Sequence, residues 1–193
     1  MYLFFDTETT GLPRDWRAPL TDFENWPRMV QLAYIVCEDA GRNIASRDYV
    51  IKPVGFSIPE EAARIHGITT EYAIKNGMPL SDVLNEVYSA LNEAHYVVAH
   101  NMSFDEKIIG AEFLRNGLED CLPTKKRICT MQSSTNYCAI SGAYGYKWPK
   151  LSELHKKLFG EDFNNAHNAA VDIAATAKCF WELCRLGIIR IPG

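Results

Sequence analysis

The chain has 193 residues but no long apolar run, no closely spaced cysteine pair and no excess of positive charge. No stretch reaches the roughly 20 apolar residues that a membrane-spanning helix requires. The apolar N-terminal run is stopped by Asp6 and has no basic segment before it, so no signal peptide is expected. The six cysteines form no Cys-x-x-Cys motif, which indicates reduced thiols. We therefore expect a cytoplasmic protein without a membrane partner.

The net charge of −4 argues against a passive, high-affinity nucleic-acid binder, because phosphate groups favour basic surfaces. The acidity is acceptable where clustered carboxylates hold divalent cations, since bound cations reverse the local electric field. The carboxylates are therefore the residues whose positions matter most.

The apolar pattern predicts an α/β domain that covers residues 1–193. A hydrophobic content of 47% is enough for one sizeable core, and no repeat or linker divides the chain. Three closely spaced early strands predict an antiparallel meander, and the helices and strands that follow predict one mixed sheet flanked by helices. Strands are expected at residues 1–6, 30–37, 47–51, 96–99 and 127–130, and helices at residues 59–66, 81–94, 104–116, 151–159 and 168–185.

Two carboxylates stand at the end of the first predicted strand. Asp6 and Glu8 are two residues apart, so their side chains share one face of the strand. A turn over residues 9–11 is expected to follow. Two anions this close repel each other unless a cation lies between them. For this motif alone, an ordinary surface acid pair is the simpler explanation.

Two further acidic residues are expected near the start of helices. Asp105 follows the apolar strand at 96–99 and falls in the first turn of the next helix, where the helix dipole favours negative charge. His167 and Asp172 are five residues apart, about 140° on a helix, so His167 is expected in the preceding loop and Asp172 on the inward face. Taken singly, these residues are also explained as a helix-capping acid, a loop histidine and a solvated acid.

Four segments together resemble the motifs of DnaQ-like exonucleases of the DEDDh type: FDTETTGL, IHGIT, HNMSFD and HNAAVDIAA. This family includes the proofreading subunit of bacterial replicative polymerases and RNase T. The resemblance runs from Met1 to about Leu186. It implies an RNase H-like fold, with a five-stranded mixed sheet and helices on both faces. It also implies a hydrolase that removes nucleotides from the 3′ end of a strand, of the DNA proofreading or repair type.

The resemblance assigns catalytic roles position by position. Asp6, Glu8, Asp105 and Asp172 would bind two divalent cations, with Asp6 bridging them, and His167 would act as the general base. Oxygen ligands suit Mg²⁺ or Mn²⁺ rather than Zn²⁺. Two such ions can activate water and neutralise the phosphate charge. A histidine with a pKa of about 6.5 can take the proton of that water at neutral pH.

Substrate contacts are also expected from the resemblance. The turn over residues 9–12 would lie beside the terminal nucleotide, with its backbone N–H groups near the 3′-hydroxyl and Leu12 wedged against a base. The IHGIT segment would form a wall for the last base. Core packing is the more economical role for Phe104. The expected substrate-binding residues are Thr9, Gly11, Leu12, Ile65, His66, Ile68, Asn101 and Phe104.

Two segments are expected to form loops near this site. The segment 13–28 is longer than the usual connection in the family and contains Trp16, Trp26 and three arginines. It predicts either a rim that grips single strands or a folded loop held by its two tryptophans. The segment 136–149, rich in tyrosine and containing Trp148, offers a second candidate surface, with local packing as the alternative.

The expected partner is single-stranded nucleic acid, with DNA favoured over RNA, and a DNA polymerase is a second candidate partner. The alternatives are an RNA-trimming exoribonuclease of the oligoribonuclease kind and a non-catalytic nucleic-acid or polymerase-binding module on the same fold. All five predicted catalytic residues are present, which favours an active enzyme. The chain ends some twenty residues after Asp172, which predicts a free-standing exonuclease or a minimal proofreading domain.

Overall fold

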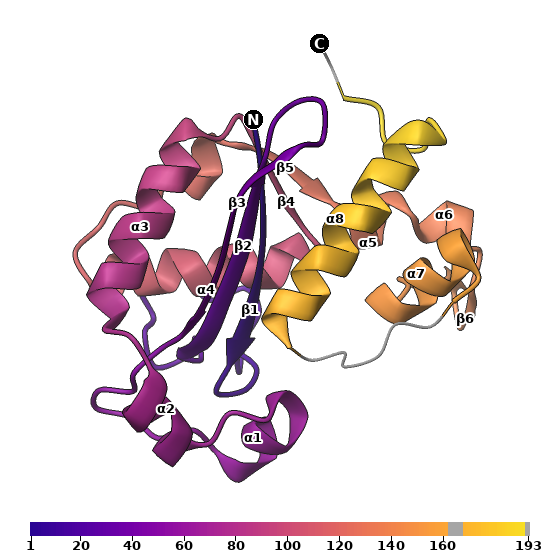
Figure 1. Cartoon of the computed structure of the whole chain (residues 1–193). Helices are drawn as coiled ribbons and strands as arrows, with labels where there is room; N and C mark the ends of the chain where they lie inside the picture. Colours follow the sequence, from indigo (N-terminus) through magenta and orange to yellow (C-terminus); the bar gives the residue numbers. More distant parts are fainter. Residues whose placement is uncertain (162–167, 192–193) are drawn as a thin grey trace.

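The computed structural model describes residues 1–161 and 168–191, and a five-stranded sheet in the order β3-β2-β1-β4-β5 forms its centre (Figure 1). The first three strands pair antiparallel, whereas β1, β4 and β5 run parallel. The predicted meander, the mixed sheet and the α/β class are confirmed. The strands are β1 (Tyr2–Thr9), β2 (Met29–Cys37), β3 (Asn43–Val50), β4 (Tyr96–Ala99) and β5 (Lys126–Cys129).

Helices cover both faces of the sheet, as expected (Figure 1). One apolar core lies between the sheet and helices α3 and α4, and a second lies between the sheet and helices α7 and α8. Within the described residues, no helix combines the length and the apolarity needed to span a bilayer. The four helices are α3 (Leu80–Glu93), α4 (Met102–Arg115), α7 (Leu151–Phe159) and α8 (Ala169–Arg185).

Strand β1 contributes to both cores because successive side chains of a strand point to opposite faces. Phe5 packs on the side of α4, whereas Phe4 packs on the side of α8. The alternation continues beyond the apolar residues. Asp6 and Glu8 therefore face α8, and Thr7 faces α4.

Short elements fill the connections, and the sequence predicts only the first helix among them. Helix α1 ends where Gly67 adopts a left-handed conformation (φ 79°). Helix α2 is capped by the Thr69 side chain, which accepts a hydrogen bond from the N–H of Tyr72. Helices this short show no full apolar period. The short elements are α1 (Glu60–His66), α2 (Thr70–Asn76), the 3₁₀ helix η1 (Leu122–Thr124), α5 (Thr130–Ser133), α6 (Thr135–Cys138), β6 (Ser141–Gly142) and β7 (Gly145–Tyr146).

Four boundaries differ from the prediction. Strand β3 begins at Asn43, four residues earlier than expected, because its pairing with β2 extends to Cys37. Strand β1 runs through Thr9 instead of turning there, because its pairing with β2 continues past the carboxylates. Ser81 does not cap α3, which begins directly after Pro79. Helix α4 begins at Met102, earlier than expected, because Asn101 turns the chain with a left-handed backbone (φ 82°).

Candidate active site

Three carboxylates from two elements meet at one end of the sheet. Asp6 and Glu8 come from β1 and Asp172 from the first turn of α8, and one carboxylate oxygen of each lies within 4.8 Å of the others. All three side chains are half-buried. Asn168 fixes the start of α8 by accepting hydrogen bonds from the N–H groups of the next turn. The structure thus brings together three of the four predicted metal ligands.

Asp105, the fourth predicted ligand, is held by the strand that carries the other two. It is 3% exposed, and its Oδ1 accepts hydrogen bonds from the Thr7 N–H (3.0 Å) and the Thr7 hydroxyl (2.7 Å). Asp105 lies outside the group of three, but its charge acts on both Asp6 and Glu8. Thr7, which lies between Asp6 and Glu8 in the sequence, therefore holds the start of α4 against β1.

The pKa values show how poorly these carboxylates are compensated by the protein itself. Burial raises the pKa of Asp6 well above its usual value, and the charges of Asp105, Asp172 and Glu8 raise it further. Burial and then the charges of Asp172 and Asp105 raise the pKa of Glu8 to about 7. Burial also raises the pKa of Asp105 to about 7, although the two Thr7 hydrogen bonds oppose the shift. Crowded anions in a desolvated place favour protonation or a bound cation.

The donor set fits a hard divalent cation. Within residues 1–161 and 168–191, no Lys or Arg forms an ion pair with Asp6, Glu8 or Asp105. Every candidate ligand atom is a carboxylate oxygen, the type that Mg²⁺ and Mn²⁺ prefer. The residues present can therefore hold the expected cations.

A cavity of about 550 Å³ adjoins the carboxylates. Its wall runs from the end of β1 across the following turn to α1, and Glu8 belongs to both the cavity and the carboxylate group. Leu12 (73% exposed) and Ile65 (60% exposed) present apolar side chains there. Six of the eight predicted substrate-binding residues line it: Thr9, Gly11, Leu12, Ile65, His66 and Phe104.

His66 gives this cavity a buried polar group. Its Nδ1 accepts a hydrogen bond from the Ile68 N–H (3.2 Å), so the neutral ring carries its proton on Nε2. Among the described residues, Nε2 has no hydrogen-bond partner. Burial lowers the pKa of His66, although the Thr9 backbone opposes the shift. The site thus offers a neutral donor beside the apolar wall.

Sequence comparison assigns the chain to a family. A family model described as exonuclease (RNase T) matches residues 3–180. The chain is 30% identical over 192 residues to an uncharacterized exonuclease of Escherichia phage 186, which covers 96% of this chain and 89% of that protein. The chain belongs to the exonuclease family. The prediction of a nuclease is confirmed at the level of this family.

Longer proteins contain a similar part. The chain is 30% identical over 177 residues to the PolC-type DNA polymerase III of Lactococcus lactis, which covers 92% of this chain and 10% of that protein. Exonuclease I of E. coli, solved in complex with a dA16 oligonucleotide, superposes with a TM-score of 0.75 at 21% identity over 96% of this chain and 40% of that one. The chain thus spans about a tenth of the polymerase and less than half of exonuclease I. The structural likeness confirms the RNase H-like fold.

Two predicted substrate-binding residues of this exonuclease-family chain lie outside the cavity wall. Ile68 is 6% exposed and packs in a small core with residues of β2, α1 and α2. Its position follows from α2, which the sequence did not predict. Asn101 caps α4, and its side-chain oxygen accepts a hydrogen bond from the Ser103 hydroxyl (3.1 Å). Core packing and helix capping explain these two residues, and substrate contact by them stays a prediction.

The second half of segment 13–28 is a folded loop. Trp26 is 2% exposed, and its Nε1 donates to the carbonyl of Pro19 (3.0 Å). The Asn25 side chain accepts from the Asp15 N–H (2.7 Å) and donates to the Asp15 carbonyl (2.9 Å). The prediction of a loop held by tryptophan is therefore confirmed for Trp26.

The first half of the segment borders the cavity. Trp16 is 44% exposed, and its ring centroid lies 5.8 Å from that of Phe104, a half-buried residue of the cavity wall. Lys107 donates to the Trp16 carbonyl (2.6 Å) and holds this part of the loop against α4. Arg14 and Arg17 are exposed. A rim that contacts single strands stays a prediction for Trp16 and these two arginines.

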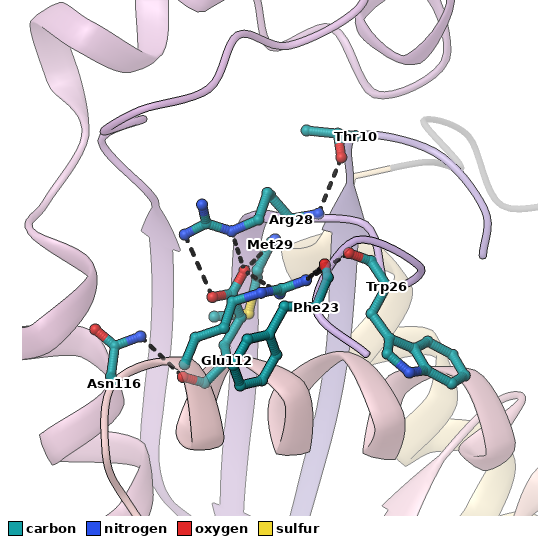
Figure 2. Close-up of polar contacts among 8 residues, drawn as sticks. Thr10, Phe23, Trp26, Arg28, Met29, Glu112 and Asn116 are labelled. Carbon is teal, nitrogen blue, oxygen red and sulfur yellow. Dashed lines mark hydrogen bonds and ion pairs between the residues drawn. The ribbon is translucent and has the colours of Figure 1, made fainter. Parts of the chain in front are cut away.

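A buried ion-pair network supports the turn after β1 (Figure 2). Glu112 of α4 is fully buried and accepts hydrogen bonds from Arg28 Nε (2.8 Å) and the Met29 N–H (3.1 Å), and Arg115 Nη1 lies 3.1 Å away. Two hydrogen bonds, each 2.9 Å long, join the backbone of Arg28 to the N–H and the hydroxyl of Thr10. The network thus ties the turn beside the cavity to helix α4, a link that no local sequence pattern indicates.

His167, the predicted general base, lies outside the described residues. His100, the histidine of the HNMSFD segment, has a structural role. Its Nδ1 lies 3.0 Å from the Thr130 hydroxyl and its Nε2 lies 3.0 Å from the Pro149 carbonyl. Burial lowers the pKa of His100 to about 4, although the Pro149 carbonyl opposes the shift. A neutral ring with a hydrogen-bond contact at each nitrogen thus connects the end of β4 to the segment before α7.

Proposed function

We propose that the chain is a metal-dependent 3′-to-5′ exonuclease acting on single-stranded nucleic acid, with DNA favoured over RNA. The observation that carries the proposal is the group of Asp6, Glu8 and Asp172, which adjoins an open cavity and whose two strand carboxylates form no ion pair with a Lys or Arg of the part of the chain that the structure describes. The preference for DNA is supported by the names of the relatives, DNA polymerases and an exonuclease I solved with a dA16 oligonucleotide.

In this proposal Asp6, Glu8 and Asp172 hold divalent cations, Mg²⁺ or Mn²⁺, and Asp105 completes the set from α4. When bound, the cations supply an activated water and neutralise charge on the phosphate. Thr7 keeps Asp105 in place through its two hydrogen bonds. His167 takes the proton of the attacking water on a ring nitrogen, which a histidine can do near neutral pH.

The cavity would receive the terminal nucleotide. Leu12 and Ile65 offer exposed apolar contacts for a base, and His66 offers a buried N–H donor. The phosphodiester bond must then reach Glu8, which the cavity and the carboxylate group share. A paired 3′ end must fray before its terminal nucleotide can enter, so blunt duplex should be degraded more slowly than a single strand.

The test uses 5′-labelled single-stranded DNA and RNA of one sequence, incubated with Mg²⁺, Mn²⁺ or EDTA. We expect a ladder that shortens from the 3′ end with either metal, no cleavage in EDTA, and faster cleavage of DNA. Asp6→Ala should abolish the ladder, whereas Asp82→Ala, which removes an exposed carboxylate on α3, should leave it unchanged. Faster cleavage of RNA would replace the DNA preference by the exoribonuclease alternative.

A second variant separates metal binding from proton transfer. His167→Ala should lower turnover roughly 10²- to 10⁴-fold, the usual contribution of a general base. Its affinity for Mn²⁺, measured by calorimetry, should change little because the carboxylates remain. Full activity of this variant would remove the histidine from the mechanism without touching the metal site. No cleavage of any substrate by the folded wild type would favour the binding-module alternative.

A further inference from the structure

Three aromatic side chains on and directly after the β6–β7 hairpin are exposed at the protein surface. Tyr144 is fully exposed, Tyr146 is 57% exposed and Trp148 is 60% exposed. Local packing, the alternative that the sequence allowed for this segment, does not account for these three rings. Neighbouring exposed rings of this size commonly mark an interaction surface.

The hairpin presents these rings on a defined backbone. Gly145 has a φ of 116°, a conformation that favours glycine, and the ladder continues where the Lys147 N–H donates to the Ile140 carbonyl (2.9 Å). Lys147 Nζ bonds to Glu153 of α7 (2.6 Å). Because side chains alternate along an extended segment, Tyr146 and Trp148 lie on the side opposite to Lys147.

The hairpin is attached to the end of the sheet that carries the carboxylates. Pro149 follows Trp148 directly, and its carbonyl lies 3.0 Å from Nε2 of His100, the residue after β4. Strands β1 and β4 are parallel, so their C-terminal ends lie at the same end of the sheet. The Asp6 and Glu8 pair therefore lies at the same end of the sheet as the contact between Pro149 and His100. Figure 1 shows β6 beside α7, on the α8 side of the sheet.

The local charge fits a polyanion. Residues 141–157 contain four lysines and one glutamate, in a chain whose net charge is −4. Aromatic rings beside basic side chains are the combination that binds single-stranded nucleic acid without sequence preference, through base stacking and phosphate attraction. A protein partner would require no such excess of lysine.

We infer that Tyr144, Tyr146 and Trp148 form a stacking surface for nucleotides upstream of the 3′ end that occupies the active site. This inference rests on the proposed function, because it places the 3′ end at the carboxylates. The surface would hold the strand beyond the terminal nucleotide. Its contribution should therefore grow with substrate length and vanish for a substrate of one nucleotide.

The experiment compares the wild type with the double variant Tyr146→Ala, Trp148→Ala. Two substrates are used: a 5′-labelled 12-nucleotide DNA strand and the p-nitrophenyl ester of thymidine 5′-monophosphate, which reaches only the terminal position. We expect KM for the 12-mer to rise roughly tenfold for each ring removed, since stacking contributes about 1–3 kcal/mol per base. Hydrolysis of the ester should be unchanged. Trp148→Tyr, which keeps an aromatic ring, should have a KM for the 12-mer close to that of the wild type.

Two controls keep this inference separate from the proposed function. Tyr72→Ala removes a comparably exposed ring on α2 (51% exposed) and should leave the hydrolysis of both substrates unchanged. Fluorescence anisotropy of the labelled 12-mer in Ca²⁺ measures binding without hydrolysis and tests the surface even if the wild type cleaves nothing. Equal binding and equal KM for the wild type and the double variant, with unchanged melting temperatures, would overturn the inference while leaving the exonuclease proposal intact.

Discussion

Helix α4 carries two buried acids, and the protein treats them in opposite ways. Glu112 is bonded to Arg28, the Met29 N–H and Arg115, so its charge is compensated inside the fold. Asp105 lies seven residues earlier, two turns along the same helix, and its Oδ1 accepts hydrogen bonds from the uncharged N–H and hydroxyl groups of Thr7. Its other neighbours include the carboxylates of β1.

The difference shows which buried charge stabilises the fold and which awaits a ligand. A buried carboxylate needs a counter-charge, and one that lacks it destabilises the folded state. Glu112 has its cations built in, at the junction of α4 with segment 13–28. The Asp105 end of the helix leaves the deficit to be filled from outside, which is the arrangement expected of a metal site.

The largest expected effect is on activity. Asp105→Asn should lower the rate of DNA hydrolysis on the order of a thousandfold, because it removes charge from the cation site. Its free energy of unfolding without metal should equal or exceed that of the wild type, since the anions repel one another less. Hydrolysis assays and urea unfolding in EDTA measure the two quantities. A stable variant with wild-type activity would break the comparison.

Glu112→Gln should act in the reverse sense. It leaves the largely buried guanidinium group of Arg115 and the half-buried one of Arg28 without their counter-charge, so unfolding should become easier by about 3 kcal/mol. The matched control is Glu106→Gln on the same helix, whose pair with Arg127 is partly exposed and contributes less than about 1 kcal/mol. Urea unfolding at pH 7 measures both. Equal losses would show that compensation inside the fold is not what distinguishes Glu112.

The comparison also predicts a pH dependence. The pKa values of Glu8 and Asp105 are raised to about 7 and that of Asp6 is raised well above its usual value, so the folded state binds more protons than the unfolded state above about pH 4.5. The free energy of unfolding of the metal-free protein should therefore fall as the pH rises towards 7 and beyond.

Urea unfolding in EDTA between pH 5 and 8 measures this slope. Saturating Mn²⁺ should flatten it, because metal binding displaces the protons. Asp105→Asn isolates the contribution of the cluster and should also give a shallower slope. A wild-type slope no steeper than that of the variant would contradict the assignment of the raised pKa values to these carboxylates.

The smallest expected effect concerns Thr7. Thr7→Val removes the hydroxyl that donates to Asp105 and should cost about 1 kcal/mol of stability. Since residues that orient metal ligands typically change affinity by 10- to 100-fold, Mn²⁺ affinity should also fall by roughly tenfold. Thr7→Ser keeps the hydroxyl and should retain the affinity. Identical Mn²⁺ affinities for the two variants would assign Thr7 a packing role only.

Local patterns explain what the sequence could predict. The alternation of β1 places Asp6 and Glu8 on one face, and the apolar strand before Asp105 places it at the start of a helix. What the sequence could not show depends on contacts between distant residues. The Thr7–Asp105 bonds join residues 98 apart, and the Arg28–Glu112 pair joins residues 84 apart.

Packing decided the remaining differences. Ile68 belongs to the IHGIT segment that resembles a family motif, yet its side chain packs in a core with residues of α1 and α2. Trp26 and Trp16 look alike in the sequence, but one is buried and the other borders the cavity. Residues of one type have different roles because their surroundings in three dimensions differ, and the sequence alone does not show those surroundings.

The most direct test of the central claim is a titration of Mn²⁺ into the metal-free protein by isothermal calorimetry, with Asp6→Asn and Glu112→Gln alongside the wild type. If the carboxylates of β1, α4 and α8 form the cation site, the wild type and folded Glu112→Gln bind Mn²⁺ with similar affinity, and Asp6→Asn loses most of the binding. Equal binding by the wild type and Asp6→Asn, or no binding at millimolar Mn²⁺, would contradict it.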